Sequence, residues 1–596
     1  MVPLCAQADG CGTLACISTK MDQSGRFFFN PILRWNSQVL NYFIEAFGAD
    51  HFSRISDALT RPSCYSCIRV NMLQTTVDDV VEELSRIIKE NGFEYSRKQG
   101  YLEHEATIKT IEEPTQNSLI SKCTIPGLDC VVFVKGSGPH SFKPDCLSDV
   151  SVKEVIVSRK CAEAVLRGAQ VFVPGVLACS AHVEKGDAVA VSVAVEQACN
   201  GGWSVGITRG TIVLFSSMFH PFFYERYGLY IGQGTAMMSR SSMFNASEGI
   251  AVELNNRVYK LPSFRDVLEG KIFHQNLPSI VAAHVLDPRK GERILDMCAA
   301  PGGKTTAIAL LMKNEGEVVA IDRSHNKVLD IQKLAAEMNL TSIKTYKLDA
   351  LKAVRQRNQC NGATASQYDP SNAERTDVFY ISISMYTKNP TCVFIHTKFF
   401  ERLFVCVIKV MMTSQVRLSH ARISNTKRKP RNGPGKNQCH GGRVENSEGF
   451  STNSFDRVLL DPPCSALGLR PRLFTGEETV ESLRNTATYQ RRMFDQAVQL
   501  VRPGGVIVYS TCTINPGENE AVVRYALDKY KFLQLTQQQP RIGERGLVGS
   551  YKFLDGCIEE WLTAEEAELV QRFDPSCPLD TVGFFIAKFR VGSKDV

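Results

Sequence analysis

The sequence lacks a hydrophobic run long enough to cross a membrane. Its most apolar stretch, residues 393–412, is interrupted by four charged residues: Lys398, Glu401, Arg402 and Lys409. A helix that spans a bilayer needs about 20 consecutive, mainly apolar residues. We therefore expect no membrane partner.

The chain also lacks a complete set of zinc ligands and a secretory signal peptide. Cys64 and Cys67 form a C-x-x-C pair, but no second cysteine or histidine pair stands at zinc-site spacing. The 20 cysteines are spread along the chain without the dense, regular spacing of a small secreted scaffold. We therefore expect no metal and a reducing compartment, namely the cytoplasm, with the nucleus as the alternative.

The composition is that of a globular protein with several domains. With 596 residues, of which 43% are hydrophobic and 22% charged, the chain is too long for one hydrophobic core. Its 69 basic residues exceed its 62 acidic residues by +7. This modest excess permits an anionic partner such as nucleic acid without requiring one. We expect the protein to act as a monomer.

Changes in composition and hydrophobic pattern along the sequence predict four segments and one insertion. Residues 1–25 are small and polar without any period, so they are predicted to be disordered. An α+β extension is expected over 26–150, and β-branched runs separated by glycines predict a small all-β barrel over 151–244. Alternating strands and helices predict a parallel α/β sheet over 245–596. Within it, residues 356–450 are predicted to form a disordered insertion, because their second half is strongly basic.

A buried strand, a glycine turn and a helix follow one another over residues 294–305. The turn has the sequence Cys298-Ala299-Ala300-Pro301-Gly302-Gly303-Lys304. Its glycines allow a ligand to approach backbone N–H groups at a helix N-terminus. A Walker A loop would require a glycine in place of Cys298, and a dinucleotide-binding G-x-G-x-x-G is absent. The pattern therefore favours a nucleoside-type cofactor without a pyrophosphate.

Carboxylates stand at the ends of the next two predicted strands. Asp322 follows Val318-Val319-Ala320-Ile321, and Asp349 follows Lys347-Leu348. Carboxylate oxygens at this edge of a sheet can accept hydrogen bonds from ribose hydroxyls and from the adenine amine. Acidic residues at strand ends are also common helix caps. Each acid alone leaves both roles open, whereas the series beside the glycine turn favours cofactor binding.

Two cysteines follow two further strands. One strand leads into Asp461-Pro462-Pro463-Cys464-Ser465, and the next leads into Thr511-Cys512-Thr513. Because open α/β sheets bind ligands at the carboxyl ends of their strands, both thiols and Asp461 are expected to face the cofactor. A lone buried cysteine is usually only a small hydrophobic side chain. Two at the same edge indicate a reactive site.

These motifs, in this order and spacing, resemble those of the Nol/Nop/Sun (NSUN) RNA cytosine-5 methyltransferases. Gln275-Asn276-Leu277-Pro278-Ser279 and Val582-Gly583-Phe584-Phe585-Ile586-Ala587 add to the likeness. The resemblance implies a Rossmann-like class I methyltransferase domain that uses S-adenosylmethionine, with Cys512 as nucleophile and Cys464 as the cysteine of product release. It also implies a pocket for cofactor and target base lined by Cys298, Ala299, Ala300, Pro301, Gly302, Gly303, Lys304, Asp322, Lys327, Asp349 and Asp461.

The chemistry of a thiol suits the substrate that the resemblance implies. Thiolate addition at carbon 6 of cytosine activates carbon 5, so that one hard step becomes two easier ones. An ordinary thiol with a pKa of about 8.5 is only slightly ionised at neutral pH, so we expect the site to lower the pKa of Cys512. Asp461 is expected to bind the N3 and N4 edge of the base, and Lys304 is counted among the catalytic residues.

A second resemblance concerns the all-β segment. Residues 162–176, which end in Val171-Phe172-Val173-Pro174-Gly175-Val176, look like the start of a PUA domain, a small β-barrel that binds RNA. A PUA domain ahead of the methyltransferase core is the arrangement of the sixth NSUN member. This implies RNA as the partner, namely tRNA near the CCA end of the acceptor stem, and mRNA as a second target. Arg167 and Gly168 are the predicted RNA contacts.

Two departures from the family pattern leave an alternative open. Ala466 stands where a glycine is usual after Pro-Cys-Ser, and the insertion after Ala353 has no recognised counterpart. The chief alternative is an RNA-binding protein that keeps the fold but has lost turnover, and a P-loop nucleotidase is a more distant one. Because Cys464 and Cys512 are both present, the sequence favours an active enzyme.

Overall fold

The computed structural model describes residues 28–90, 119–140, 153–199, 202–213, 228–264, 266–355 and 445–594. Contacts divide the chain into two units, and the larger one contains all the site residues discussed below. The segment predicted to be disordered at the N-terminus and nearly all of the predicted insertion lie outside the described residues. Within the described ranges, no helix is long and apolar enough to cross a membrane.

The N-terminal extension combines helices with a four-stranded antiparallel sheet of order β13-β1-β3-β2. Asn36 begins the first helix, because its side chain accepts hydrogen bonds from the backbone N–H groups of Gln38 and Val39. Gly48, with φ +82°, separates the first helix from the second. The elements are α1 (Ser37–Phe47), α2 (Ala49–Leu59), β1 (Tyr65–Val70), α3 (Val77–Glu90), β2 (Ile120–Lys122), β3 (Val131–Lys135) and β13 (Ile272–His274).

The all-β segment forms a seven-stranded sheet of order β10-β6-β4-β7-β11-β12-β5 around its own core of valines and other small apolar residues. Its last strand, β12, lies beyond residue 244, where the sequence placed the end of this segment. Ala251, Val252 and Leu254 of that strand enter the same core, which explains why the sheet continues. The elements are β4 (Lys153–Ser158), α4 (Arg159–Leu166), β5 (Val171–Phe172), η2 (Val173–Gly175), β6 (Val176–Ser180), β7 (Ala188–Ala194), β8 (Gln197–Cys199), β9 (Gly202–Ser204), β10 (Thr211–Val213), β11 (Tyr230–Ala236), α6 (Arg240–Asn245) and β12 (Ile250–Arg257).

The C-terminal part is a nine-stranded sheet of order β17-β16-β15-β14-β18-β19-β24-β20, with β23 also paired to β24. The strands from β17 to β19 run parallel, and β24 is antiparallel to β19. The elements are α7 (Leu277–Val285), β14 (Arg293–Asp296), α8 (Gly303–Leu311), β15 (Glu317–Asp322), α9 (His325–Glu337), β16 (Ile343–Lys347), η3 (Ala350–Lys352), β17 (Glu445–Asn446), β18 (Phe455–Leu460), α11 (Val480–Leu500), β19 (Val501–Thr511), η4 (Pro516–Glu518), α12 (Glu520–Lys529), β20 (Leu533–Leu535), β21 (Ser550–Lys552), β22 (Ile558–Glu560), α13 (Ala564–Ala567), β23 (Val570–Phe573) and β24 (Phe584–Val591).

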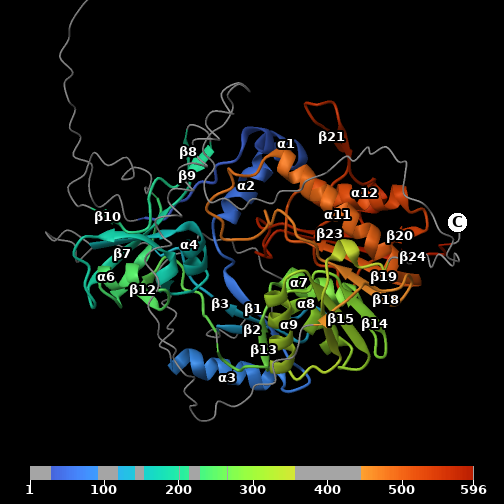
Figure 1. The fold of residues 1–596 in the computed structure, drawn as a ribbon, viewed down its shortest axis with the longest axis horizontal. Helices are drawn as coiled ribbons and strands as arrows, with labels where there is room; N and C mark the ends of the chain where they lie inside the picture. The colour runs from blue at the N-terminus through green and yellow to red at the C-terminus, as the bar shows by residue number, and fades with distance from the viewer. Residues whose placement is uncertain are drawn as a thin grey trace, which may run out of the picture. The chain divides into compact units, whose positions relative to one another are not determined.

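Helices cover both faces of this sheet. Val458 and Leu460 of β18 pack into one core with residues of α11 and α12, while Leu459 packs into a second core with α7 and α8 (Figure 1). Strands buried on both faces are uniformly apolar, which is why β18 and β19 carry continuous hydrophobic runs. The polar chemistry is therefore confined to the strand ends.

The predicted insertion leaves and rejoins the sheet at neighbouring points. The backbone N–H of Arg355 donates to the carbonyl of Phe450 at 2.8 Å, and that of Phe450 donates to the carbonyl of Ala353 at 2.7 Å. Shortening a loop between adjacent ends changes its closure free energy by only about 0.6 kcal/mol per halving. The fold therefore does not depend on the length of this connection.

Replacing residues 357–443 with a short Gly/Ser linker is expected to leave the melting temperature unchanged or slightly higher, because backbone hydrogen bonds between residues 353–355 and Phe450 already hold the two flanking segments together. Thermal unfolding followed by circular dichroism measures this. Methyl transfer, the activity that the sequence resemblance implies, provides the second readout. A lower melting temperature, or lost methylation with normal cofactor binding, would show that the replaced segment is a working part.

Candidate active site

The order in which the chain adds strands to the sheet reverses between β14 and β18. From β14 the chain proceeds through β15, β16 and β17 toward one edge and then returns to β18, which pairs with β14. Ligands of open α/β sheets bind beyond the carboxyl ends of the strands at such a switch point. The residues just beyond these two strands, 297–304 and 461–465, therefore mark the site.

The glycine turn joins β14 to α8. Gly302 has φ +105° and stands immediately before α8, a backbone conformation that favours glycine. A Cβ on Gly303 would lie 2.9 Å from the ring of Phe273, so this position also requires the smallest residue. The backbone N–H of Ala299 donates to the carbonyl of Ile321, which fixes the turn against β15. The turn thus presents the first N–H groups of α8 in a fixed arrangement.

Asp296, at the end of β14, supplies a buried acceptor that the sequence analysis missed. Its Oδ2 accepts a hydrogen bond from the Thr305 hydroxyl at 2.8 Å. Its Oδ1 is buried without a partner among the described residues, and burial raises the pKa of this carboxyl to about 6. An unpaired buried polar group costs about 1–3 kcal/mol. Because Asp296 lines the cavity described below, a bound molecule with an amino group fits this oxygen.

Asp322 and Asp349, the carboxylates at or just after the ends of β15 and β16, each use one oxygen to accept a hydrogen bond from a backbone N–H group two residues later. Asp322 Oδ1 accepts from the backbone N–H of Ser324, and Asp349 Oδ1 accepts from that of Leu351, each at 3.0 Å. No described residue donates to the second oxygen of either group, which leaves that oxygen for a ligand. Lys327 lies exposed on the first turn of α9. Their roles in cofactor binding stay predictions.

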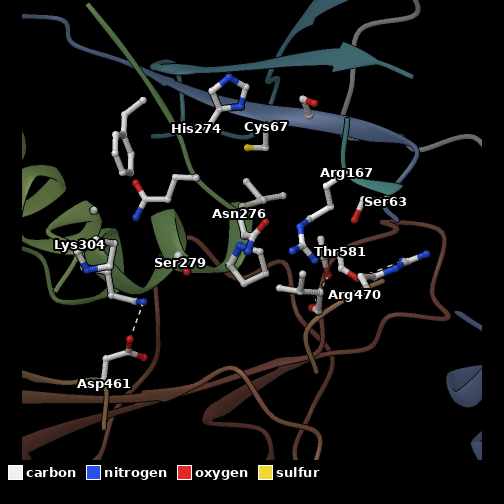
Figure 2. A pocket seen from close by; sticks show the side chains of 18 of the residues that line it. Ser63, Cys67, Arg167, His274, Asn276, Ser279, Lys304, Asp461, Arg470 and Thr581 are labelled. Carbon is white, nitrogen blue, oxygen red and sulfur yellow. Dashed lines mark hydrogen bonds and ion pairs between the residues drawn. The ribbon is translucent and has the colours of Figure 1, made fainter. Parts of the chain in front are cut away.

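Lys304 and Asp461 form an ion pair that links α8 to the end of β18. Lys304 Nζ donates to Asp461 Oδ2 at 2.8 Å (Figure 2). The Ser510 hydroxyl donates to Asp461 Oδ1 at 2.8 Å. Burial alone lowers the pKa of Lys304, but the Asp461 carboxylate more than offsets this and raises it. The lysine is therefore held as a cation next to the carboxylate.

The two thiols meet beyond the ends of β18 and β19. The sulfur atoms of Cys464 and Cys512 lie 3.3 Å apart, and both side chains are partly exposed. The hydrogen bond from Cys464 lowers the pKa of Cys512, with a further lowering from the Lys304 cation. The same hydrogen bond, followed by burial, raises the pKa of Cys464. The pair therefore favours ionisation of Cys512 over ionisation of Cys464.

A buried glutamate that sequence reasoning missed ties the two cysteine loops together. Glu518 accepts hydrogen bonds from the backbone N–H of Ser465 at 2.9 Å and from the Gln490 amide at 2.8 Å. The hydroxyls of Ser465 and Thr513 also lie 2.8 Å apart. The only signal in the sequence is an acid shortly after Thr511-Cys512-Thr513, within Asn515-Pro516-Gly517-Glu518. These bonds hold the two cysteine loops next to each other.

The thiol pair predicts a pH dependence. Cys464→Ala removes the hydrogen bond that lowers the pKa of Cys512, so the pH midpoint for ionising Cys512 is expected to rise. The rate of Cys512 alkylation by iodoacetamide, followed by peptide mass spectrometry across pH 6 to 10, measures the midpoint. Cys557→Ser, a change at an exposed cysteine, is the control. An unchanged or lower midpoint in Cys464→Ala would contradict this assignment.

Ala466 adopts a backbone conformation that favours glycine. Its φ is +55°, which explains why a glycine is usual at this place in the NSUN pattern. A left-handed conformation costs an L-residue about 1–2 kcal/mol. The departure noted in the sequence is therefore tolerated with some backbone strain.

Ala466→Gly is expected to raise the free energy of unfolding by up to about 1 kcal/mol. The relief of strain exceeds the extra flexibility that glycine gives the unfolded chain, which is worth about 0.4–1 kcal/mol. Urea denaturation compares the two proteins. A loss of stability in the glycine variant would show that the alanine methyl makes contacts that outweigh the strain.

A cavity of about 450 Å³ connects this site with the all-β segment. Lys304 and Asp461 line it together with Arg167, and Figure 2 shows Arg167 apart from the ion pair, toward the other side of the view. A Cβ on Gly168 would lie 2.9 Å from the carbonyl oxygen of Leu261, so packing within the chain explains this glycine. In the described ranges no cluster of His, Cys, Asp or Glu is arranged to hold a metal ion.

Arg69 of β1 connects the N-terminal extension to the glycine turn, which sequence reasoning also missed. Its Nη2 donates to the Thr306 hydroxyl at 2.7 Å and to the Gly303 carbonyl at 3.2 Å. Its Nε donates to the Gln275 side chain at 2.9 Å. Only 2% of Arg69 is exposed. The N-terminal extension therefore stabilises the glycine turn through a buried side chain.

Comparisons with known proteins cover nearly the whole chain. A family model described as 16S rRNA methyltransferase RsmB/F matches residues 283–366 and 413–590, and a PUA domain model matches residues 153–198. An Arabidopsis thaliana protein named rRNA (cytosine-C(5))-methyltransferase NOP2C is 58% identical over 577 residues, which are 96% of this chain and 93% of that protein.

Two further relatives carry names that refer to tRNA or to NSun6. The mouse protein named tRNA (cytosine(72)-C(5))-methyltransferase NSUN6 is 33% identical over 490 residues, with 78% of this chain and 79% of the relative covered. The crystal structure of NSun6 from Pyrococcus horikoshii with SFG is 25% identical and superposes with a TM-score of 0.58, covering 94% of this chain and 99% of that one.

Proposed function

Because this chain belongs to the family of RNA cytosine-5 methyltransferases that includes the RsmB/F and NSUN proteins, we propose that its reaction proceeds through the thiol of Cys512. The observation that carries the proposal is the contact of 3.3 Å between the sulfurs of Cys512 and Cys464 beside the Lys304–Asp461 ion pair. A structural cysteine needs neither a partner thiol nor a nearby cation.

The cofactor is S-adenosylmethionine, which supplies an electrophilic methyl group when bound; the solved NSun6 relative carries the analogue SFG. In our proposal the backbone of residues 298–304 and the free oxygen of Asp296 hold its amino acid portion. Asp322 accepts from the ribose hydroxyls, with Lys327 nearby, and Asp349 accepts from the adenine amine. The orphaned Asp296 oxygen and the fixed glycine turn support this assignment.

The protein's own groups act on the cytosine in a defined order. The Cys512 thiolate adds to carbon 6 of a ring that carries a proton from solvent on N3, so the electrons of the C5–C6 double bond shift to give a neutral enamine. The Asp461 carboxylate accepts hydrogen bonds from the N3–H and N4–H groups, and Lys304 keeps that carboxylate oriented. After methylation of carbon 5, its proton passes to water, the electron pair of that C–H bond re-forms the C5–C6 double bond, and the Cys512 sulfur leaves carbon 6 as a thiolate, which restores the aromatic ring. Cys464, whose sulfur lies 3.3 Å from that of Cys512, is the neighbouring group that assists this elimination.

We further propose that the target cytosine lies near the 3′ end of a tRNA acceptor stem. Arg167 of the PUA segment lines the same cavity as Lys304 and Asp461, so an RNA end held by Arg167 would have its nearby bases beside this ion pair. Arg167 carries a cation on an exposed side chain, which suits a phosphate.

Three RNA substrates separate the alternatives. The purified protein is incubated with S-adenosylmethionine and either a tRNA transcript, a ribosomal RNA fragment or a messenger RNA fragment, and 5-methylcytosine is measured by nucleoside mass spectrometry. Methylation of the tRNA, with loss when its acceptor stem is altered, is the expected result. Methylation of only the ribosomal or only the messenger fragment would show that this RNA, and not tRNA, is the substrate. Absence of methylation in all three RNAs would favour an RNA-binding protein without turnover.

A further inference from the structure

The contact between Cys464 and Cys512 has a chemical consequence apart from methyl transfer. The two residues follow adjacent parallel strands, with Leu460 of β18 paired to Tyr509 of β19. Adjacent strands lie about 4.8 Å apart, a separation at which cysteine side chains can be bridged. Among the described residues no other two thiols are hydrogen-bonded to each other.

We propose that Cys464 and Cys512 are a modification site at which mild oxidation forms a reversible disulfide. A disulfide requires sulfurs about 2.05 Å apart, so the present separation of 3.3 Å must close by roughly 1.3 Å. Cys464 lies in a loop without helix or strand, whose backbone is held by the Ser465–Glu518 hydrogen bond, so rotation of the two cysteine side chains must close this gap. Both side chains are partly exposed, so a small oxidant reaches them.

The oxidation balances with one hydroperoxide as the oxidant. The Cys512 thiolate attacks the peroxide oxygen and becomes a sulfenic acid, releasing hydroxide or alkoxide that takes up a proton. The sulfur of Cys464 then attacks the Cys512 sulfur, the S–O bond breaks, and the departing hydroxide takes the Cys464 proton to form water. Two thiols and one hydroperoxide thus give one disulfide, one water and one further water or alcohol.

The unequal ionisation of the two thiols favours this order. The hydrogen bond from Cys464 lowers the pKa of Cys512, and thiolates rather than thiols react with peroxides. Cys464 is then the resolving cysteine next to the sulfenic acid. Because the disulfide consumes the proposed nucleophile, the loss of methylation on oxidation rests on the proposed function, whereas the disulfide itself rests on the geometry alone.

Peptide mapping of the full-length protein tests the inference. The protein is treated with hydrogen peroxide, alkylated, and digested without reductant. A cross-linked pair of peptides containing Cys464 and Cys512 is expected, together with a fall in Cys512 alkylation of about tenfold or more that dithiothreitol reverses. Cys557→Ser, which changes an exposed cysteine elsewhere, should give the same result.

The variant without the resolving thiol sharpens the test. In Cys464→Ala the sulfenic acid has no neighbouring thiol, so Cys512 is expected to proceed to the sulfinic acid, which dithiothreitol does not restore. If the wild type shows the same irreversible oxidation, or if Cys512 is linked to another cysteine, the proposal is overturned. Disulfide formation in a protein that never methylates RNA would instead reject the proposed function and leave this inference standing.

Discussion

Cys512→Ala is expected to abolish both methylation and the covalent protein–RNA adduct, whereas Cys464→Ala is expected to accumulate the adduct. Without Cys512 no bond to carbon 6 forms, and the uncatalysed methyl transfer is negligible on the time scale of an assay. Without Cys464 the bond still forms, but the group that assists its elimination is missing. The two neighbouring thiols thus give opposite results when each is removed.

A denaturing gel with labelled tRNA measures the adduct, and filter-bound radioactive methyl groups measure turnover. The control is Cys557→Ser, which changes an exposed cysteine away from the site and should behave as the wild type in both assays. Equal loss of adduct in the Cys464 and Cys512 variants would contradict the assignment of Cys512 as nucleophile and Cys464 as the cysteine of product release. Adduct accumulation in Cys512→Ala would reverse the assignment.

Asp461→Asn is expected to slow methyl transfer by about 10²- to 10⁴-fold, the range typical of losing a group that acts in proton transfer. The amide keeps the shape of the side chain but removes the charge that pairs with Lys304 at 2.8 Å. It also cannot supply the two carboxylate oxygens that accept hydrogen bonds from the N4–H group and the protonated N3 of cytosine. Cofactor binding should change little, because the glycine turn remains intact.

Single-turnover kinetics with the protein in excess over tRNA measure this rate, and calorimetric titration with S-adenosylmethionine measures binding. Ser510→Ala is the matched control, since it removes only the second hydrogen bond to Asp461 at 2.8 Å and should cost about tenfold or less. A rate within threefold of the wild type for Asp461→Asn would exclude this carboxylate from the reaction. A parallel loss of cofactor binding would place Asp461 in the cofactor site instead.

The fold class and the family were accessible from the sequence because their signals are local. The glycine turn and the cysteines after β18 and β19 occupy short motifs whose order survives in a single chain. The family comparisons confirm the methyltransferase fold, the PUA domain and the use of S-adenosylmethionine. Local patterns also predict which residues end strands, and the carboxyl ends of parallel strands share one edge of the sheet.

The supporting residues escaped prediction because their contacts are distant in sequence. Arg69 reaches Thr306 across more than two hundred residues, and Glu518 reaches the loop after Cys464 across about fifty. Neither residue belongs to a recognisable motif, and a single buried charge cannot be told from a surface charge without the tertiary structure. Gly168 stays a predicted RNA contact; the structure adds that a Cβ there would lie 2.9 Å from the carbonyl oxygen of Leu261, a packing contact that the sequence does not reveal.

The central claim is that the Cys512 sulfur bonds to cytosine in RNA, and peptide mapping of a trapped complex tests it most directly. The protein is incubated with S-adenosylmethionine and tRNA that carries 5-azacytidine, which blocks release, and the complex is digested with nuclease and trypsin. Mass spectrometry is expected to find the modified nucleotide on the peptide that contains Cys512, and on no other. A nucleotide on Cys464, or a methylated RNA with no covalent complex at either thiol, would contradict the account.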